Sequence, residues 1–100
     1  MLSANIPNAT RRQVYARDGY RCALCDSTNG LQIHHFIKRS EGGSNQLMNL
    51  ITLCWKCHAA AHGTTVQDYP DYVTADYIEQ AVAEYLGDYY LQDFYPFGED

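Results

Sequence analysis

The chain has 100 residues, which is enough for one small domain, and a domain of this size often needs a bound metal as a staple. Residues 1–13 show neither the apolar stretch nor the cleavage pattern of a signal peptide, and no apolar run approaches the length that spans a bilayer. We therefore expect a soluble, cytoplasmic protein without a membrane partner. Its four cysteines then predict metal binding rather than disulfides.

The net charge of −5 is distributed very unevenly along the chain. Residues 1–63 carry seven Lys/Arg and three Asp/Glu, a net charge of +4, together with every cysteine and histidine. Residues 64–100 carry no Lys/Arg and nine Asp/Glu, a net charge of −9, together with seven of the nine tyrosines. This asymmetry predicts an anionic partner for residues 1–63 and an acidic, tyrosine-rich extension over residues 64–100.

The first predicted element is a short helix over residues 8–19. Asn8 or Thr10 is a candidate N-cap, and Gly19 is a candidate end of the helix. Residues 20–25 follow as a predicted strand that leads into a tight turn.

A second strand is predicted over residues 31–37. Side chains alternate between the two faces of a strand, so the adjacent His34 and His35 should point to opposite sides. Residues 40–45 form a loop by composition, because they contain two consecutive glycines between polar residues.

Residues 49–63 begin as a turn or short strand and become helical around Cys57, with Gly63 as a candidate C-cap. Residues 64–73 form a connector in which Pro70 interrupts regular structure.

The strongest helix signal in the chain covers residues 74–87. Thr74 is a plausible N-cap, Asp76 suits the first turn, and Gly87 suits the end. One stripe of this helix is apolar and consists of Ile78, Val82 and Leu86. Residues 88–100 are aromatic and acidic and show no assignable pattern.

Two Cys-x-x-Cys pairs, Cys22/Cys25 and Cys54/Cys57, carry the clearest metal signal. Each pair can present two thiolates to one zinc ion, and two pairs complete a tetrahedral site. Redox dithiols and unrelated buried cysteines are the alternatives, but a redox motif needs no second copy. A closed four-cysteine site has no open coordination position, so we expect the zinc to stabilise the fold rather than to catalyse.

The four histidines form a second constellation. His58 and His62 are four residues apart on a predicted helix, as two ligands of one ion require. One of His34 and His35 can join them at the metal, while the other takes a proton from water, a role that suits neutral histidine. The alternative is that these histidines are ordinary surface or core residues that bind no metal. Nearby, Asn49 is a candidate for pinning the loop backbone, whereas Asn45 is expected to be an ordinary loop residue.

Together these residues resemble the HNH endonuclease family over about Arg11 to Gly63. The resemblance rests on RDGYRC-x2-C, LQIHHF, EGGSN-x3-NL and LC-x2-CH-x3-H. It implies an α+β fold with a small ββα-metal (His-Me finger) unit stapled by a four-cysteine zinc site, and residues 1–63 would form the HNH nuclease core. An N-terminal helix would precede this unit, and the helical acidic extension would follow it.

The resemblance also implies roles for individual residues. The letters of the family name would correspond to His35, Asn49 and His58. His35 would be the general base, and Asn49 would orient it through a backbone hydrogen bond. His34, His58 and His62 would hold a catalytic Mg²⁺, Mn²⁺, Ni²⁺ or Zn²⁺ ion, and an all-histidine set favours the softer ions.

DNA is the partner that the resemblance implies, and basic residues around the motif are candidates for contacting its phosphates. Those we select are Lys38, Arg39, Arg12 and Lys56. The alternative for each is a solvated surface charge or an ion pair, and Lys38 and Arg39 are the better phosphate candidates because they directly follow the predicted strand that carries His35. For Arg17 we expect an intramolecular partner such as Asp18 or a helix end.

Three roles remain open for residues 64–100. They pack on the core, bind a partner protein or a second copy, or cover the basic face and restrain cleavage. The leading function is a DNA endonuclease that nicks or cuts both strands. The alternative is a non-catalytic, zinc-stapled nucleic-acid-binding or adaptor module of a phage DNA-packaging assembly, with a terminase or another DNA-processing protein as partner. Target sequence and oligomeric state are left undetermined.

Overall fold

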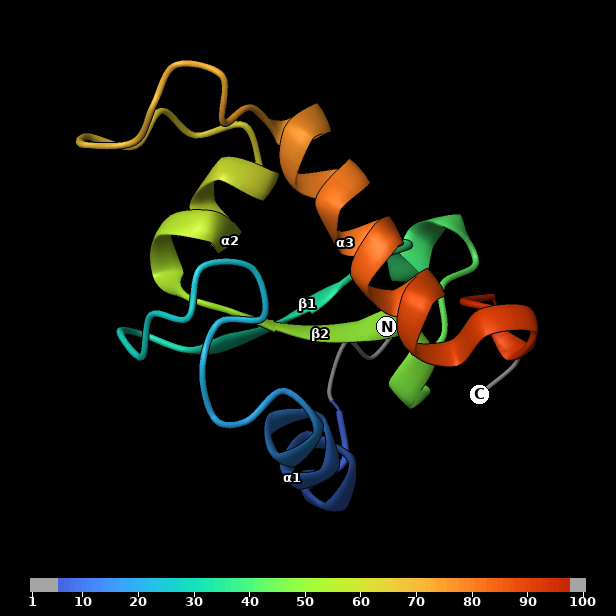
Figure 1. Cartoon of the computed structure of the whole chain (residues 1–100). Coiled ribbons are helices and arrows are strands. Elements are labelled where there is room, and N and C mark those ends of the chain that lie inside the picture. The colour runs from blue at the N-terminus through green and yellow to red at the C-terminus, as the bar shows by residue number, and fades with distance from the viewer. Residues whose placement is uncertain (1–5, 98–100) are drawn as a thin grey trace.

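Two short antiparallel strands lie between helices in the structure, a computed structural model that describes residues 6–97 (Figure 1). The regular elements are α1 (Asn8–Arg17), β1 (Gln32–His35), β2 (Leu50–Leu53), α2 (Trp55–Ala61) and α3 (Ala75–Tyr90). Single 3-10 turns cover Arg39–Glu41, Leu47–Asn49 and Leu91–Asp93. Within the described residues, no helix combines the length and the apolar character needed to cross a membrane.

Strand β2 is the centre of the molecule, because all four of its residues are buried. It pairs antiparallel with β1, from Gln32 opposite Leu53 to His35 opposite Leu50. Alternate residues of β2 serve different layers, as the two-residue period of a strand requires. Leu50 packs with Val14 of α1, whereas Ile51 and Leu53 join the core beneath α2 and α3. Figure 1 shows α1 on one side of the sheet and α2 and α3 on the other.

Helix α3 buries the apolar stripe that the sequence predicts. Ile78, Val82 and Leu86 are at most 2% exposed and belong to the same core cluster as Cys22, Cys54 and Cys57. The Thr74 side chain caps the helix by accepting a hydrogen bond from the backbone N–H of Tyr77 (3.2 Å). The acidic extension therefore supplies one wall of the core around the cysteines.

The predicted end of this helix at Gly87 is wrong, because α3 continues to Tyr90. The helix ends where Leu91 adopts a φ of 56°. The additional turn brings Tyr90 to α1, where its hydroxyl accepts a hydrogen bond from Arg17 Nη1 (3.0 Å). Helix propensity, which depends on neighbouring residues only, cannot predict such a long-range contact.

Two predictions for the N-terminal third are also wrong. Residues 20–25 form turns rather than a strand. Local hydrogen bonds hold these turns, since the N–H of Cys22 donates to the Ser27 carbonyl and that of Asp26 donates to the Cys22 carbonyl. One long-range bond, from the Ala23 N–H to the Thr52 carbonyl (3.0 Å), attaches the segment to β2. Neither Asn8 nor Thr10 caps α1, since both lie inside the helix and Pro7 occupies the cap position.

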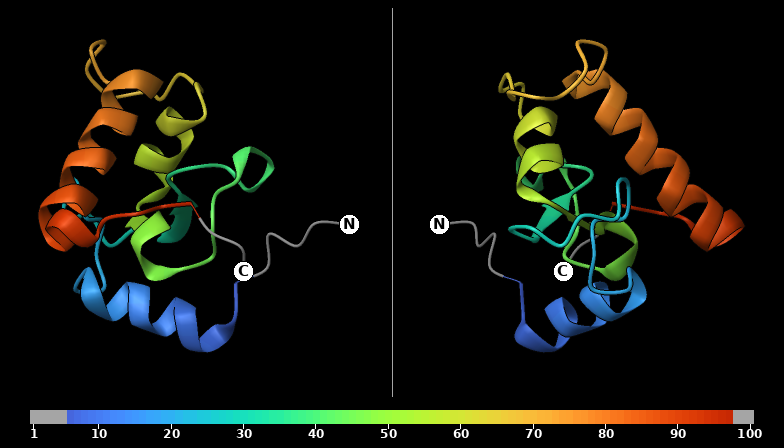
Figure 2. Two further views of the ribbon diagram at one scale, coloured as in Figure 1. Left: turned by 90° about the vertical axis from the view of Figure 1, so that its right-hand side faces the viewer. Right: turned by 60° about the vertical axis from the view of Figure 1, so that its left-hand side comes forward.

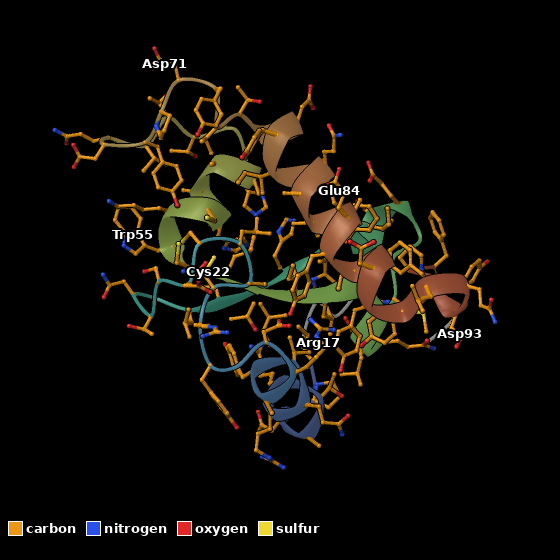
Figure 3. The ribbon with its side chains drawn as sticks, in the orientation of Figure 1. Arg17, Cys22, Trp55, Asp71, Glu84 and Asp93 are labelled. Carbon is orange, nitrogen blue, oxygen red and sulfur yellow. The ribbon has the colours of Figure 1, made fainter. Side chains whose placement is uncertain are left out.

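A buried ion pair ties α1 to the sheet and to α3, and it confirms the expected partner of Arg17. The Arg17 guanidinium donates to both carboxylate oxygens of Asp18 (2.8 and 2.9 Å) and to the Leu50 carbonyl (2.6 Å). The same carboxylate accepts hydrogen bonds from the Thr52 N–H and the Tyr85 hydroxyl, each at 2.8 Å. Figure 3 labels Arg17 between α1 and the sheet.

The C-terminal segment, which the sequence left unassigned, returns across the loop that follows β1. Phe97 forms an isolated β-bridge with Gly43, and the Ser44 N–H donates to the Pro96 carbonyl (3.1 Å). Figure 2 shows this segment leaving α3 and crossing toward the loop. Residues 98–100 lie outside the described part of the chain.

Candidate active site and metal centres

The two Cys-x-x-Cys pairs meet in one cluster, as their spacing predicts. Cys22 and Cys25 lie on the turn after α1, whereas Cys54 and Cys57 lie at the junction of β2 and α2. The four sulfur atoms all lie within 4.8 Å of one another. The Tyr69 hydroxyl reaches the cluster from the connector and lies 2.9 Å from the Cys57 Sγ. This arrangement gives a tetrahedral ion four ligands from two separate turns.

The thiols of the cluster influence one another's ionisation. A hydrogen bond from Cys57 lowers the pKa of Cys22 to about 4 against the opposing effect of burial, and the same bond raises the pKa of Cys57. The proton on Cys57 thus stabilises the Cys22 thiolate. A second thiolate in the cluster would be repelled by the negative charge of the first. A divalent ion that accepts sulfur ligands can replace such protons, and four cysteine sulfurs are a donor set that suits zinc.

Three histidines form a second cluster, separate from the first. His34 of β1 and His58 and His62 of α2 place ligand nitrogens within 4.8 Å of one another. The Nε2 atoms of His58 and His62 are 3.2 Å apart, as their four-residue spacing on a helix allows. The His34 ring lies edge-on to the other two, with centroid distances of 5.3 and 5.7 Å.

The environment of this cluster keeps His58 in the form that binds metals. Burial, followed by the neighbouring His34 and His62, lowers the pKa of His58 to about 4. Its imidazole is therefore neutral at pH 7, and only a neutral ring has a nitrogen lone pair to offer an ion. Three imidazole nitrogens suit a softer ion such as Ni²⁺ or Zn²⁺ better than Mg²⁺.

His35 has different neighbours from His34, although the two residues are adjacent. Its Nε2 lies 2.7 Å from the Asn45 Oδ1, and its ring does not belong to the three-histidine cluster. Because an amide oxygen only accepts hydrogen bonds, this contact places the proton of a neutral His35 on Nε2 and leaves Nδ1 as an acceptor. Because side chains alternate between the two faces of β1, the His34 ring lies in the three-histidine cluster and the His35 ring lies outside it.

Asn49 is fully buried and closes the loop that follows β1. Its side-chain amide accepts a hydrogen bond from the Ile37 N–H (2.8 Å) and donates to the carbonyls of Ile37 (3.0 Å) and Ser44 (2.8 Å). These bonds clamp the two ends of the loop. The amide binds the backbone and not the His35 ring, so any effect on His35 is transmitted through the loop.

Asn45 is the residue that sequence reasoning missed. It was expected to be an ordinary loop residue, but its side chain contacts His35 directly. The signal in the sequence is weak, because ten residues separate the two positions. Only the folding of the intervening loop by Gly43 and Asn49 brings them together.

All four histidines line one open cleft of about 930 Å³. Lys38 and Arg39 also line it, and the Arg39 Nη1 donates to the Gly43 carbonyl (2.8 Å). Arg11 lines the cleft as well, although it was not among the selected phosphate contacts.

The other two selected residues, Arg12 and Lys56, do not line this cleft. Lys56 instead lies over the rings of Trp55 and Tyr69, at 5.7 and 5.8 Å from their centroids, on the side of the cysteine cluster. Figure 3 labels Trp55 and Cys22 on that side.

Comparison with known proteins converges on the segment that holds both clusters. A family model described as HNH endonuclease matches residues 22–64. Anaredoxin of Nostoc sp. is 40% identical over 53 residues, which cover 52% of this chain and 70% of anaredoxin. The probable mobile endonuclease C of Enterobacteria phage T4 is 45% identical over 40 residues, which cover 40% of this chain and 19% of the phage protein. The match to the family model ends before α3.

Proposed function

The chain belongs to the HNH endonuclease family, and from this premise we propose that it is a metal-dependent endonuclease that hydrolyses phosphodiester bonds of DNA. The observation that carries the proposal is the shared cleft. A three-histidine cluster, a fourth histidine with an acceptor nitrogen and three basic residues all line the same cleft. In the proposed division of the chain, residues 1–63 are the nuclease core and residues 64–100 are an extension that packs on it.

In the proposed reaction His35 is the general base. Its Nδ1 takes a proton from a water molecule while Asn45 holds Nε2, and the water oxygen forms a bond to the scissile phosphorus. The bond from phosphorus to the 3′ oxygen breaks, and this oxygen leaves with the bonding electron pair and takes a proton from a solvent water molecule. The protonated His35 later returns its own proton to solvent. Asn49 keeps the loop that carries Asn45 in place.

Two ions take part in the proposal. Zinc held by Cys22, Cys25, Cys54 and Cys57 stabilises the fold. A second divalent ion, Mg²⁺, Mn²⁺, Ni²⁺ or Zn²⁺, held by His34, His58 and His62, would supply positive charge to the phosphate and to the leaving oxygen. Lys38 and Arg39 would hold the DNA backbone along the cleft, and the wider basic surface, with Arg12 and Lys56, would attract the duplex.

A specific observation favours an adaptor role as the second candidate. Several aromatic side chains of the extension are exposed by more than 40%, and they are Tyr72, Tyr77, Tyr89, Tyr95 and Phe97. Exposed tyrosines are common in protein interfaces. In this alternative the chain would bind nucleic acid or a DNA-processing partner, such as a phage terminase, without cutting.

A cleavage assay separates the two candidates. Protein that carries zinc only at its cysteines is mixed with supercoiled plasmid, and Mg²⁺, Mn²⁺, Ni²⁺ or Zn²⁺ is then added. The nuclease proposal predicts metal-dependent nicking or linearisation that a chelator stops before the zinc is lost. DNA binding without cleavage in all four ions would instead support the adaptor.

A further inference from the structure

Glu79 reaches the three-histidine cluster from outside the segment that matches the family model. It lies on α3, whereas the match covers residues 22–64. Its Oε1 is 2.9 Å from the Nε2 of His34, whose side chain is only 7% exposed. Glu79 also lines the cleft that holds all four histidines. The acidic extension therefore places a carboxylate at the edge of the metal cluster.

The packing of α3 holds this carboxylate in place. Ile78, immediately before Glu79, is 2% exposed, and Val82, one turn later, is fully buried. The burial of Ile78 and Val82 fixes the rotation of α3 about its own axis, and this rotation directs Glu79 toward the cleft. Its own side chain is 36% exposed, which leaves it open to the solvent that fills the cleft.

A second histidine of the cluster shows the same pattern. The Nε2 of His58 faces His62, and its Nδ1 contacts the Oε1 of Gln32. Two of the three rings therefore have a side-chain oxygen acceptor on one ring nitrogen. Acceptors of this kind fix the orientation and tautomer of a metal-binding histidine, and a carboxylate also makes the ring a stronger donor to the ion.

We propose that Glu79 is a positioning residue of the metal site: it holds the His34 ring and places a negative charge beside the bound cation. This inference rests on the proposed function, because it assumes that the three histidines hold an ion. It assigns to the acidic extension a part in the active site that the −9 charge of residues 64–100 alone does not suggest. Loss of such an outer partner typically weakens metal binding by about 10- to 100-fold.

The test measures metal affinity rather than cleavage. Protein with zinc at its cysteines is titrated with Co²⁺, and binding at the histidines is followed by visible absorption. We expect Glu79→Gln to raise the dissociation constant for Co²⁺ by about tenfold or more. Glu79→Asp should recover part of the lost affinity. Glu84→Gln is the matched control, because Glu84 is an exposed carboxylate on the same helix, and it should bind like the unmodified protein.

Thermal unfolding before Co²⁺ is added shows whether each variant is folded, so a weaker fold is not mistaken for a weaker site. An unchanged dissociation constant in folded Glu79→Gln would overturn this inference alone. Tighter binding would also overturn it and would identify Glu79 as a competitor of the ion for His34. If the unmodified protein bound no Co²⁺ at its histidines, the metal site of the proposed function would fail as well.

Discussion

Gly43 shows how much the site depends on one missing side chain. A Cβ atom at this position would lie 1.8 Å from the Ile37 carbonyl oxygen and 2.9 Å from the Asn49 Nδ2. Both atoms belong to the hydrogen bonds that close the loop after β1. The loop can therefore close through these hydrogen bonds without rearrangement only if residue 43 is glycine.

We predict that Gly43→Ala lowers the free energy of unfolding by at least about 2 kcal/mol, because the backbone must move to remove the clash. Gly87→Ala is the control. Gly87 lies inside α3 with no atom within 4 Å of an added Cβ, so alanine should stabilise the protein by up to about 1 kcal/mol. Chemical denaturation of both variants measures the difference, and equal stabilities would contradict the described loop.

Asn45 allows the role of the His35 contact to be tested separately from the fold. We predict that Asn45→Ala slows plasmid cleavage by about fivefold, since an orienting hydrogen bond is worth about 1 kcal/mol. Stability should change little, and Asn45→Asp should recover activity because it keeps an oxygen acceptor. Gln46→Ala, at an exposed neighbouring position, is the control. A full rate in folded Asn45→Ala would show that this contact does not orient the base.

At the residue scale, the sequence predicted the two clusters of candidate ligands better than the residues that contact them. Cys22, Cys25, His58 and His62 were recognisable because each pair sits within one turn of chain, where spacing dictates geometry. Supporting residues such as Asn45 and Glu79 act across loops and between elements. No local spacing marks such contacts, so they emerge only from the folded chain.

At the scale of elements, β2 and α3 determine where the site lies. Strand β2 is buried along its whole length and leads directly into α2, which carries two of the clustered histidines. Helix α3 was predictable from its apolar stripe and its Thr74 cap. The strand predicted at residues 20–25 was wrong because this segment folds into turns that are held by their own hydrogen bonds and by a bond from the Ala23 N–H to the Thr52 carbonyl of β2, and this choice depends on tertiary context.

Leu86 tests whether α3 is part of the core rather than an appended arm. It is fully buried in the cluster that contains three of the four cysteines. We predict that Leu86→Ala lowers the free energy of unfolding by about 2–5 kcal/mol, the range for a buried leucine that leaves a cavity. Leu91→Ala is the control, because Leu91 is 70% exposed just after the same helix, and it should change stability by less than about 0.5 kcal/mol. Similarly small changes in the free energy of unfolding of both variants would contradict the packing of α3 in the core.

At the scale of the whole molecule, the two clusters of candidate metal ligands have different surroundings. The cysteine cluster is embedded in the main core, whereas the histidine cluster opens onto the cleft. The charge of the chain follows the same division, with the basic residues confined to residues 1–63 and α3 turning one carboxylate toward the cleft. Composition alone revealed the asymmetry, but only the packing shows which acidic residue meets the site.

We predict that removing the cysteine-bound ion unfolds the protein, because three of its four sulfur ligands are core residues. Circular dichroism during titration with a strong chelator should show loss of helix as zinc is released. Acid should have the same effect, since protons compete with the ion for the thiolates. As a control, a weak chelator that strips only the histidine site should leave the spectrum unchanged. A protein that keeps its fold without any bound ion would contradict a structural role for this site.

The central claim is that His35 acts as the base beside a separate metal cluster, and one comparison tests it most directly. The rate of plasmid nicking is measured for the unmodified protein and for His35→Ala, both with zinc at the cysteines and the same saturating Mn²⁺. We predict that His35→Ala is slower by at least about 100-fold, as expected for loss of a general base. Its affinity for Mn²⁺ should be unchanged, because His35 is not part of the three-histidine cluster. Equal nicking rates in the two proteins would contradict this assignment. So would a slower His35→Ala protein whose affinity for Mn²⁺ is also lower.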